Sequence, residues 1–182
     1  MKKIIVIAAA LIGLTSAAKA QSASGSAQQT VQLSLSNALE ITFVANSSAT
    51  GATVSLPFTT ANDYANGVES AAQQLKVRSN KNFNVTVKAN AATFTVTNGA
   101  TTTASTMPAS VLDVKVSTNG TGGAIAGTFA GYTDLSTTAT NMITNGTYGG
   151  NQTFSVMYKA APGFAYAAGT YNMDVVYTAT QQ

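Results

Sequence analysis

Hydrophobic and polar residues alternate with a period of two in several short stretches of this chain. The alternation is clearest near the C-terminus, over residues 152–159 and 170–180. One face of these stretches carries Phe154, Val156 and Tyr158 in the first, and Tyr171, Met173, Val175, Tyr177 and Ala179 in the second. This spacing is typical of strands that turn one face to a core. We expect the last strand to lie deep within its sheet.

Weaker alternation predicts further strands over residues 30–36, 39–44, 52–58, 94–96 and 112–116. Residues 74–79 and 83–88 alternate on both sides of a polar turn, which predicts a β-hairpin. Residues 60–72 have a roughly helical spacing and predict a loop with one helical turn. Residues 101–109 are polar and of low complexity, and predict a loop.

Roughly eight to ten short strands separated by turn residues, without a long helix, predict an all-β fold. The expected architecture is a single antiparallel immunoglobulin-like β-sandwich. The chain has no cysteine and no tryptophan, so this expectation rests on the number and spacing of strands. No disulfide supports the fold, and the core alone has to stabilise it.

The first 20 residues predict a signal peptide. Lys2 and Lys3 precede the apolar residues 4–14, and Ala18-Lys19-Ala20 forms a small-x-small cleavage site. The expected organisation is a signal peptide over residues 1–20, an N-terminal segment over 21–36 and a β-sandwich domain over 37–182. We expect secretion through a periplasm to the cell surface or beyond, with no membrane span after cleavage.

Removal of the signal peptide changes the charge of the protein. The sequence has nine basic and six acidic residues, and three of the basic residues (Lys2, Lys3 and Lys19) lie in the signal peptide. Six basic and six acidic residues remain, so the mature chain is neutral. A neutral surface with few charges argues against nucleic acid as a partner and favours association with other subunits.

The residue types that most enzymes require are largely absent. The chain has no histidine and no cysteine, which excludes Ser-His-Asp and Cys-His catalysis and the usual zinc sites. Two of the six acids could pair as in a glycosidase. However, Asp113 and Asp174 fall on polar strand faces, where solvated carboxylates are normal. We therefore expect no enzymatic activity, no cofactor and no metal.

Three aromatic residues lie in Gly-rich or Pro-containing stretches that predict exposed loops. They are Tyr148, Phe164 and Tyr166. One interpretation is a patch that stacks on a surface glycan or docks a partner protein. The other is that these rings cover an end of the sandwich, and the sequence leaves both open.

The two ends of the mature chain resemble a known family. Alternating Val31, Leu33 and Leu35 near the N-terminus, and the C-terminal run AGTYNMDVVYT over residues 168–178, resemble major subunits of chaperone–usher fimbriae. The resemblance is greatest to the spore-coat-U and colonisation-factor branches. Many fimbrial subunits carry a disulfide, whereas this chain has no cysteine.

The resemblance implies a sandwich that lacks one strand and is completed by the N-terminal segment of a neighbouring subunit. Val31, Leu33 and Leu35 would fill the groove of the neighbour. Four residues of the C-terminal strand would border this groove: Tyr171, Met173, Val175 and Tyr177. The implied partners are like subunits in a homo-oligomer or polymer, with a periplasmic chaperone and an usher during assembly.

Two alternatives remain open at this stage. Residues 30–36 are equally well explained as the first strand of their own domain. The function that we expect is a non-enzymatic structural subunit of a bacterial surface fibre. The alternative is an adhesin module that binds a carbohydrate or another surface as a monomer.

Overall fold

The structure is a computed structural model that describes residues 24–182. The predicted signal peptide and its cleavage site therefore lie outside the described residues. Contacts divide the chain into one unit that ends at Ser34 and a second unit, Leu35–Gln182. Residues 24–38 form no regular secondary structure. No helix within the described range has the length and apolar character needed to cross a membrane.

The second unit is built almost entirely of antiparallel strands, which confirms the predicted all-β fold. Residues 24–182 contain thirteen strands, nine of them five residues or longer, and one short α-helix. The elements are β1 (Leu39–Phe43), α1 (Ala61–Asn66), β2 (Val68–Glu69), β3 (Gln73–Ser79), β4 (Phe83–Ala89), β5 (Thr93–Asn98), β6 (Thr101–Pro108), β7 (Leu112–Gly120), β8 (Ala124–Ile125), β9 (Thr133–Asp134), β10 (Thr140–Gly146), β11 (Gly149–Ala160), β12 (Thr170–Asn172) and β13 (Val175–Gln181).

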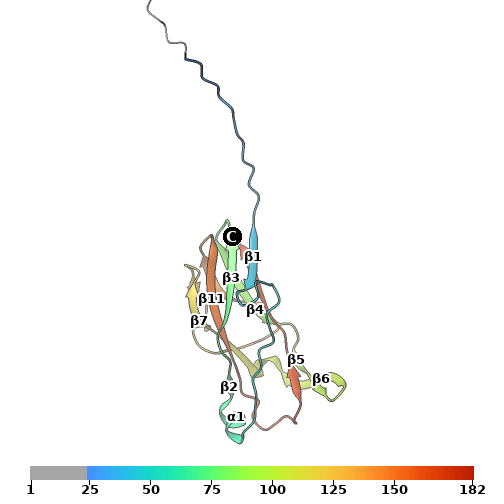
Figure 1. Cartoon of the computed structure of the whole chain (residues 1–182). Helices are drawn as coiled ribbons and strands as arrows, with labels where there is room; N and C mark the ends of the chain where they lie inside the picture. The colour runs from blue at the N-terminus through green and yellow to red at the C-terminus, as the bar shows by residue number, and fades with distance from the viewer. Residues whose placement is uncertain (1–23) are drawn as a thin grey trace, which may run out of the picture. The chain divides into compact units, whose positions relative to one another are not determined.

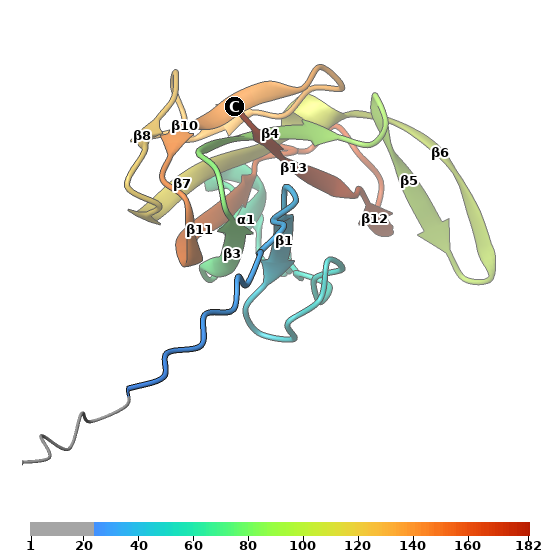
Figure 2. The same ribbon diagram turned by 90° about the horizontal axis from the view of Figure 1, so that it is seen from above.

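The strands form two packed layers and a small third sheet. The first sheet has the order β1-β3-β11-β7-β9, with β2 also paired to β11. The second sheet has the order β13-β4-β10-β8 and packs over the first (Figure 2). The third sheet, β12-β5-β6, projects from one side of the sandwich, as Figures 1 and 2 show.

The core lies between the first and second sheets, as alternation with a period of two requires. The first sheet contributes Leu75, Val77, Val114, Phe154 and Val156, and the second contributes Phe83, Val85, Val87, Met142 and Ile143. All of these side chains are at most 4% exposed. The alternating residues identified from the sequence in β3, β4, β7 and β11 are thus the residues that form the core.

The expected hairpin over residues 74–88 is wrong, although both of its strands exist. β3 belongs to the first sheet and β4 to the second, so the turn between them crosses from one layer to the other. Both strands bury one full face, Leu75 and Val77 opposite Phe83 and Val85. Period-two alternation identifies the buried face of a strand but not its hydrogen-bonded partner, and a connection between layers has the same pattern as a hairpin.

The predicted C-terminal strand is divided and does not lie deep in a sheet. β12 pairs with β5 in the third sheet, whereas β13 pairs with β4 and is the edge of the second sheet. The division falls at Met173 and Asp174. Asn90 donates its backbone N–H to the carbonyl of Asp174 and its side-chain amide to the Asp174 carboxylate, at 3.0 Å each. Asp174 is thus hydrogen-bonded to Asn90 at the end of β4, whereas β12 is paired with β5.

Three further expectations about strands are not met. Residues 30–36 and 52–58 are not strands, and 101–108, expected as a loop, forms β6. Val54, Leu56 and Phe58 still pack against the core on alternate positions. No backbone hydrogen bond joins residues 52–58 to a strand in the described part of the chain. β6 was missed because it lies on an exposed edge, where only Met107 is buried and no apolar period is needed.

The predicted helical turn is confirmed as α1. Thr60 is the N-cap, and its hydroxyl accepts a hydrogen bond from the backbone N–H of Asp63. The Asp63 carboxylate accepts from the backbone N–H groups of Thr60 and Thr59 at 2.7 and 2.8 Å, which lowers the pKa of Asp63. This reciprocal pair satisfies orphan N–H groups at the start of the helix.

Candidate functional site

An open seam runs between β1 and β13, the two strands that border the same side of the sandwich. Within residues 24–182, β1 forms a ladder with β3 and a single bridge from Phe43 to Ser48, and β13 pairs only with β4. No ladder joins β1 to β13, although Figure 2 shows them on facing edges of the two layers. The edge of β13 beside the seam is therefore free, and that of β1 is free except at Phe43, whose backbone N–H donates to the carbonyl of Ser48. Free edges of this kind can accept another strand.

The seam contains an apolar cavity of about 200 Å³. Its lining is mainly aliphatic and aromatic, and comprises Ile41, Thr42, Phe43, Ala49, Leu75, Val175, Val176 and Tyr177. Ile41, Phe43, Val175 and Tyr177 are only partly buried, although they pack against the core. The core is therefore more exposed to solvent along the seam than it is between the two sheets.

Tyr177 forms the floor of the seam. Its ring packs edge-on against Phe43 and Phe154, with centroids 6.3 and 6.4 Å away. Its hydroxyl lies 2.8 Å from the hydroxyl of Tyr158 on β11, so this hydrogen bond links the two sheets beneath the seam. The side chain of Tyr177 is partly exposed, but its hydroxyl is enclosed with that of Tyr158, and this burial raises the pKa of both tyrosines.

One end of the seam is closed by Gln181. Its side-chain amide donates to the carbonyl of Ala38 at 2.8 Å, and to Asn80 Oδ1 and Ser79 Oγ at 3.0 and 3.1 Å. These bonds join the last residues of β13 to the start of β1. The cavity opens below this closure, between the middle of β1 and the first half of β13.

The four residues expected to border a groove differ in position. Val175 and Tyr177 line the cavity of the seam. Tyr171 and Met173 are partly buried against the same core, but Tyr171 belongs to β12 in the third sheet. The seam is thus bordered on this side by β13 alone, and on the other side by β1, which the sequence did not identify as a border.

The three residues expected to fill a groove are fully accessible to solvent. Val31, Leu33 and Leu35 are 77%, 81% and 89% exposed. The polar residues between them are exposed as well, and the segment makes no strand pairing among the described residues. Three large aliphatic side chains at alternate positions in water are unusual for an unpartnered segment, because their burial is worth roughly 1.5–3 kcal/mol each.

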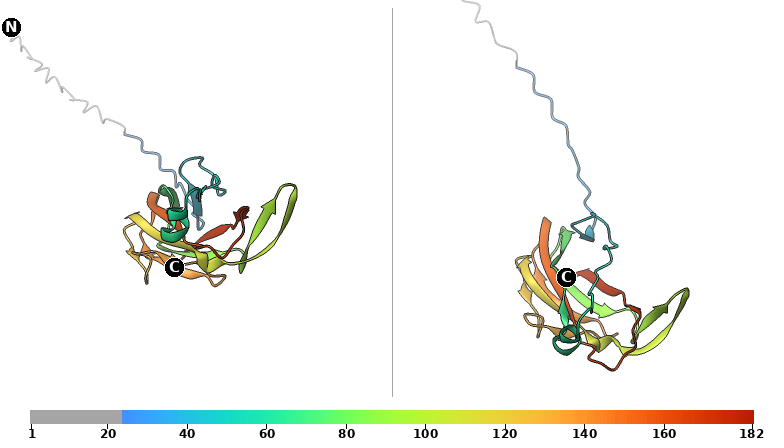
Figure 3. Two further views of the ribbon diagram at one scale, coloured as in Figure 1. Left: turned by 90° about the horizontal axis from the view of Figure 1, so that it is seen from below. Right: turned by 60° about the horizontal axis from the view of Figure 1, so that its bottom comes forward.

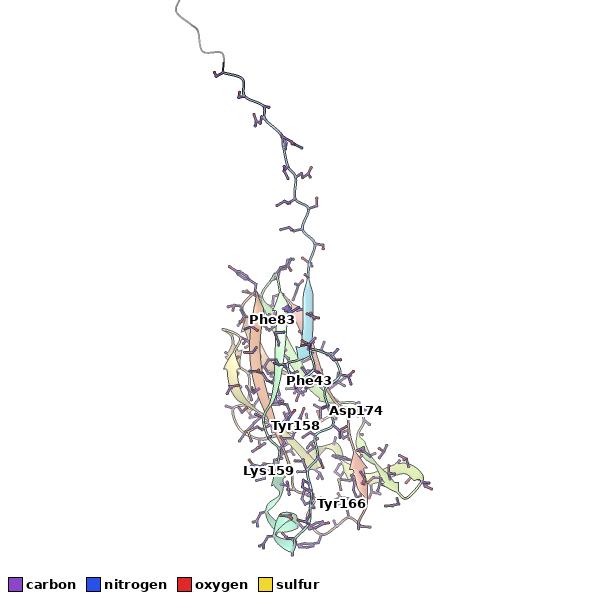
Figure 4. The ribbon with its side chains drawn as sticks, viewed as in Figure 1. Phe43, Phe83, Tyr158, Lys159, Tyr166 and Asp174 are labelled. Atoms are coloured by element: carbon purple, nitrogen blue, oxygen red, sulfur yellow. The ribbon has the colours of Figure 1, made fainter. Side chains whose placement is uncertain are left out.

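The three expected patch residues do not lie together. Tyr148 directly precedes β11, whereas Phe164 and Tyr166 follow its last residue, Ala160. The 12 residues of β11 place them roughly 35 Å apart along the strand. Figure 4 shows Tyr166 near the α1 end, away from Phe83. Phe164 instead stacks on Tyr64 of α1.

Two acids meet on the outer face of the first sheet, a pairing that the sequence did not indicate. Asp113 of β7 lies opposite Asp134 of β9 on one side and Lys159 of β11 on the other. Lys159 also forms an ion pair of 3.8 Å with Glu69 of β2. Partial burial, a hydrogen bond to Asp134 and its negative charge raise the pKa of Asp113 to about 6, against the attraction of Lys159.

This row of charges is not enclosed. Asp113 and Asp134 lie on the sheet face that points away from the core, and neither lines the cavity in the seam. A substrate pocket is typically concave and mostly apolar. The seam, with its free edges and apolar cavity, is therefore the better candidate for a functional site.

Sequence comparison with protein-family models and with curated proteins finds no match for the chain.

Proposed function

We propose that the protein is a structural subunit of a bacterial surface fibre, and that it assembles by β-strand addition. In this proposal the N-terminal segment of one copy enters the seam of the next and becomes a strand between β1 and β13. The observation that carries the proposal is the coexistence of an exposed alternating segment and an open apolar seam in one chain. The segment has apolar side chains without a core to enter, and the seam has an apolar cavity without a strand to cover it.

Backbone and side chains would both contribute to this assembly. The free edge of β13 offers N–H and C=O groups to an added strand, and main-chain pairing supplies affinity. Val31, Leu33 and Leu35 occupy alternate positions, so all three face the same side of an added strand and enter the apolar cavity together. A shift by one residue would turn them to solvent, which fixes the register.

The experiment that tests the proposal is binding of a peptide with residues 24–36 to the chain that begins at Ser36. Tyrosine fluorescence is a suitable signal, since the chain has no tryptophan and Tyr177 lies in the seam. We expect saturable binding and a change in emission. A matched peptide with serine at positions 31, 33 and 35 should not bind. Equal binding of the two peptides would contradict the proposal.

A further inference from the structure

A cluster of three aromatic rings occupies the end of the sandwich at which α1 lies. Tyr64 of α1 packs against Phe58 and Phe164, with ring centroids 5.4 and 5.5 Å away. Phe164 is nearly parallel to Tyr64, yet it is 73% exposed. We call Phe58, Tyr64 and Phe164 the aromatic end. Figure 3 shows α1 at this end, viewed from below. A large ring that is exposed but held by neighbours is a typical anchor of protein interfaces.

The opposite end carries a shallow hollow beside the start of β1. It is lined by Leu39, Glu40, Arg78, Asn80 and Tyr148, together with Asn37, Ala38, Ser79, Gly149 and Gly150. Tyr148 is 68% exposed. Asn80 donates to the carbonyl of Ser36 and accepts from the backbone N–H of Ala38. These bonds fix residues 36–38 to this end, which we call the exit end.

The direction of an added strand follows from the arrangement of β1 and β13. β13 runs from the α1 side towards the exit end, and β1 runs the opposite way (Figure 1). A strand between β1 and β13 must be antiparallel to one of them and parallel to the other. The seam edge of β1 is already bridged at Phe43, whose backbone N–H donates to the carbonyl of Ser48. β13 is therefore the freer edge within residues 24–182, and an antiparallel pairing with it matches every ladder among the described strands. A strand that pairs antiparallel with β13 would run from the exit end towards the aromatic end.

The opposite direction would not permit a fibre. A strand parallel to β13 would place the body of its subunit at the exit end of the acceptor. The N-terminal segment of the acceptor leaves from that same end, at residues 36–38. The two subunits would then meet exit end to exit end and form a closed dimer, which leaves no surface for a third subunit. A head-to-tail polymer requires its two contact surfaces at different places on each subunit. Antiparallel addition to β13 meets this requirement.

The connection between the N-terminal segment and β1 is short, which limits how far the exit end of one subunit can lie from the seam of its neighbour. Leu35 is four residues before Leu39, the first residue of β1, and an extended chain of that length spans at most about 14 Å. A subunit whose Leu35 lies in the seam of its neighbour therefore holds its exit end within about 14 Å of that residue, on the side of the neighbour that carries the aromatic end.

We propose that successive subunits form a second contact, in which Phe164 of one copy docks into the hollow beside Leu39 and Tyr148 of the next. This inference rests on the proposed function and deepens it by naming a second surface of each subunit and its partner. The contact would remove the exposed rings of Phe164 and Tyr148 from water at every junction. It would also fix the angle between neighbours, because strand addition alone joins them only through the chain between Leu35 and Ser36.

The test is disulfide trapping between copies, for which the cysteine-free chain is well suited. The doubly substituted chain Tyr148→Cys/Phe164→Cys is allowed to assemble and is then oxidised. A disulfide forms only when two Cα atoms approach to about 4.4–6.8 Å. We expect a ladder of covalent dimers, trimers and longer species on a denaturing gel without reductant, and loss of the ladder on reduction. The matched control is Tyr148→Cys/Lys88→Cys, in which the second cysteine lies on the exposed face of β4.

The outcomes separate this inference from the proposed function. Fibres that form normally, but give no more ladder with Phe164→Cys than with Lys88→Cys, would overturn the end-to-end contact and leave strand addition standing. If the doubly substituted chain does not assemble, the single variant Phe164→Ala provides a second test of the contact. This variant should form fibres that are shorter or more flexible than those of the unchanged protein, and unaltered fibres would overturn the contact. An unchanged chain that remains monomeric would overturn both proposals.

Discussion

Two tyrosine hydroxyls hold the sheets together directly beneath the seam. Tyr158 is 7% exposed, and its hydroxyl lies against that of Tyr177. A buried hydroxyl without a partner costs about 1–3 kcal/mol, whereas one net hydrogen bond contributes about 1 kcal/mol. The hydrogen bond therefore stabilises the fold mainly because either hydroxyl, buried without the other, would lower the free energy of unfolding.

Replacement of Tyr177 by phenylalanine should destabilise the protein. The ring contacts with Phe43 and Phe154 remain, but the Tyr158 hydroxyl loses its partner. We expect a loss of about 1–2 kcal/mol in the free energy of unfolding, measured by urea denaturation. The double variant Tyr158→Phe/Tyr177→Phe should recover part of this loss, because no unpaired hydroxyl remains.

The matched control is Tyr148→Phe, at a residue that is 68% exposed. Its free energy of unfolding should change by less than about 0.5 kcal/mol, as is usual for surface substitutions. Equal effects of Tyr177→Phe and Tyr148→Phe would show that the hydroxyl pair does not stabilise the fold.

The Asp113–Asp134 pair predicts a specific dependence of stability on pH. The pKa of Asp113 is raised from 3.8 to about 6, so the folded state favours the protonated carboxyl. Its stabilising effect is fully present below about pH 4 and is lost as the pH rises through about 6. Asp113→Asn should therefore raise the free energy of unfolding at pH 7.5 by up to about 1 kcal/mol, a figure reduced for solvent screening, and leave it unchanged at pH 4.

Thermal denaturation at the two pH values checks this expectation. The matched control is Glu40→Gln, which removes an exposed acid from a surface ion pair of 3.5 Å with Arg78. Such a pair contributes little, and its loss should not stabilise the protein at pH 7.5. A destabilised Asp113→Asn variant at pH 7.5 would mean that the attraction of Lys159 outweighs burial and repulsion.

At the scale of elements, the sequence identified which residues are buried better than it identified which strands pair. Leu75, Val77, Phe83 and Val85 were all assigned correctly to buried faces. Their strands nevertheless belong to different sheets. The alternation records contact with the core and contains no information about the hydrogen-bonded neighbour. The crossing between layers depends on long-range packing that no local pattern specifies.

Local alternation also predicted only part of the candidate site. Val175 and Tyr177 were expected at a groove and do line the cavity, because their alternation places them on the core face of an edge strand. β1 as the opposite border, the closure by Gln181 and the meeting of Asp113 with Asp134 depend on contacts between residues distant in the sequence. The pattern of residues 30–36 predicted a strand, but a strand needs a neighbour, and the chain provides none within residues 24–182.

The N-terminal segment offers a direct test at this scale. Replacement of Val31, Leu33 and Leu35 together by serine should abolish assembly, because the apolar side chains that enter the seam are lost. All three are at least 77% exposed, so the thermal stability of an isolated subunit should change little. Size-exclusion chromatography and thermal denaturation of the same preparation measure both effects.

The control for this variant alters the other face of the segment. Gln32→Ala/Ser34→Ala leaves the three apolar residues in place and should assemble normally. Loss of assembly in both variants would indicate that the segment acts through its flexibility or general composition, and not through the alternation.

At the scale of the whole molecule, the core of the sandwich is well covered except along the seam between β1 and β13. Ile41 and Phe43 of β1 and Val175 and Tyr177 of β13 are only partly buried there, and no ladder joins the two strands. The chain has no disulfide to compensate for this weakness. An added strand would complete the core and join the two sheets, so assembly and subunit stability should rise together.

The most direct test of this claim compares the chain of residues 21–182 with one that begins at Ser36. Size and thermal stability are measured for both at the same concentration. We expect the longer chain to form oligomers that resist heat, and the shorter chain to be monomeric and to unfold at a lower temperature. Two monomers of equal stability would contradict this expectation, because residues 21–35 would then contribute nothing to assembly or to the fold.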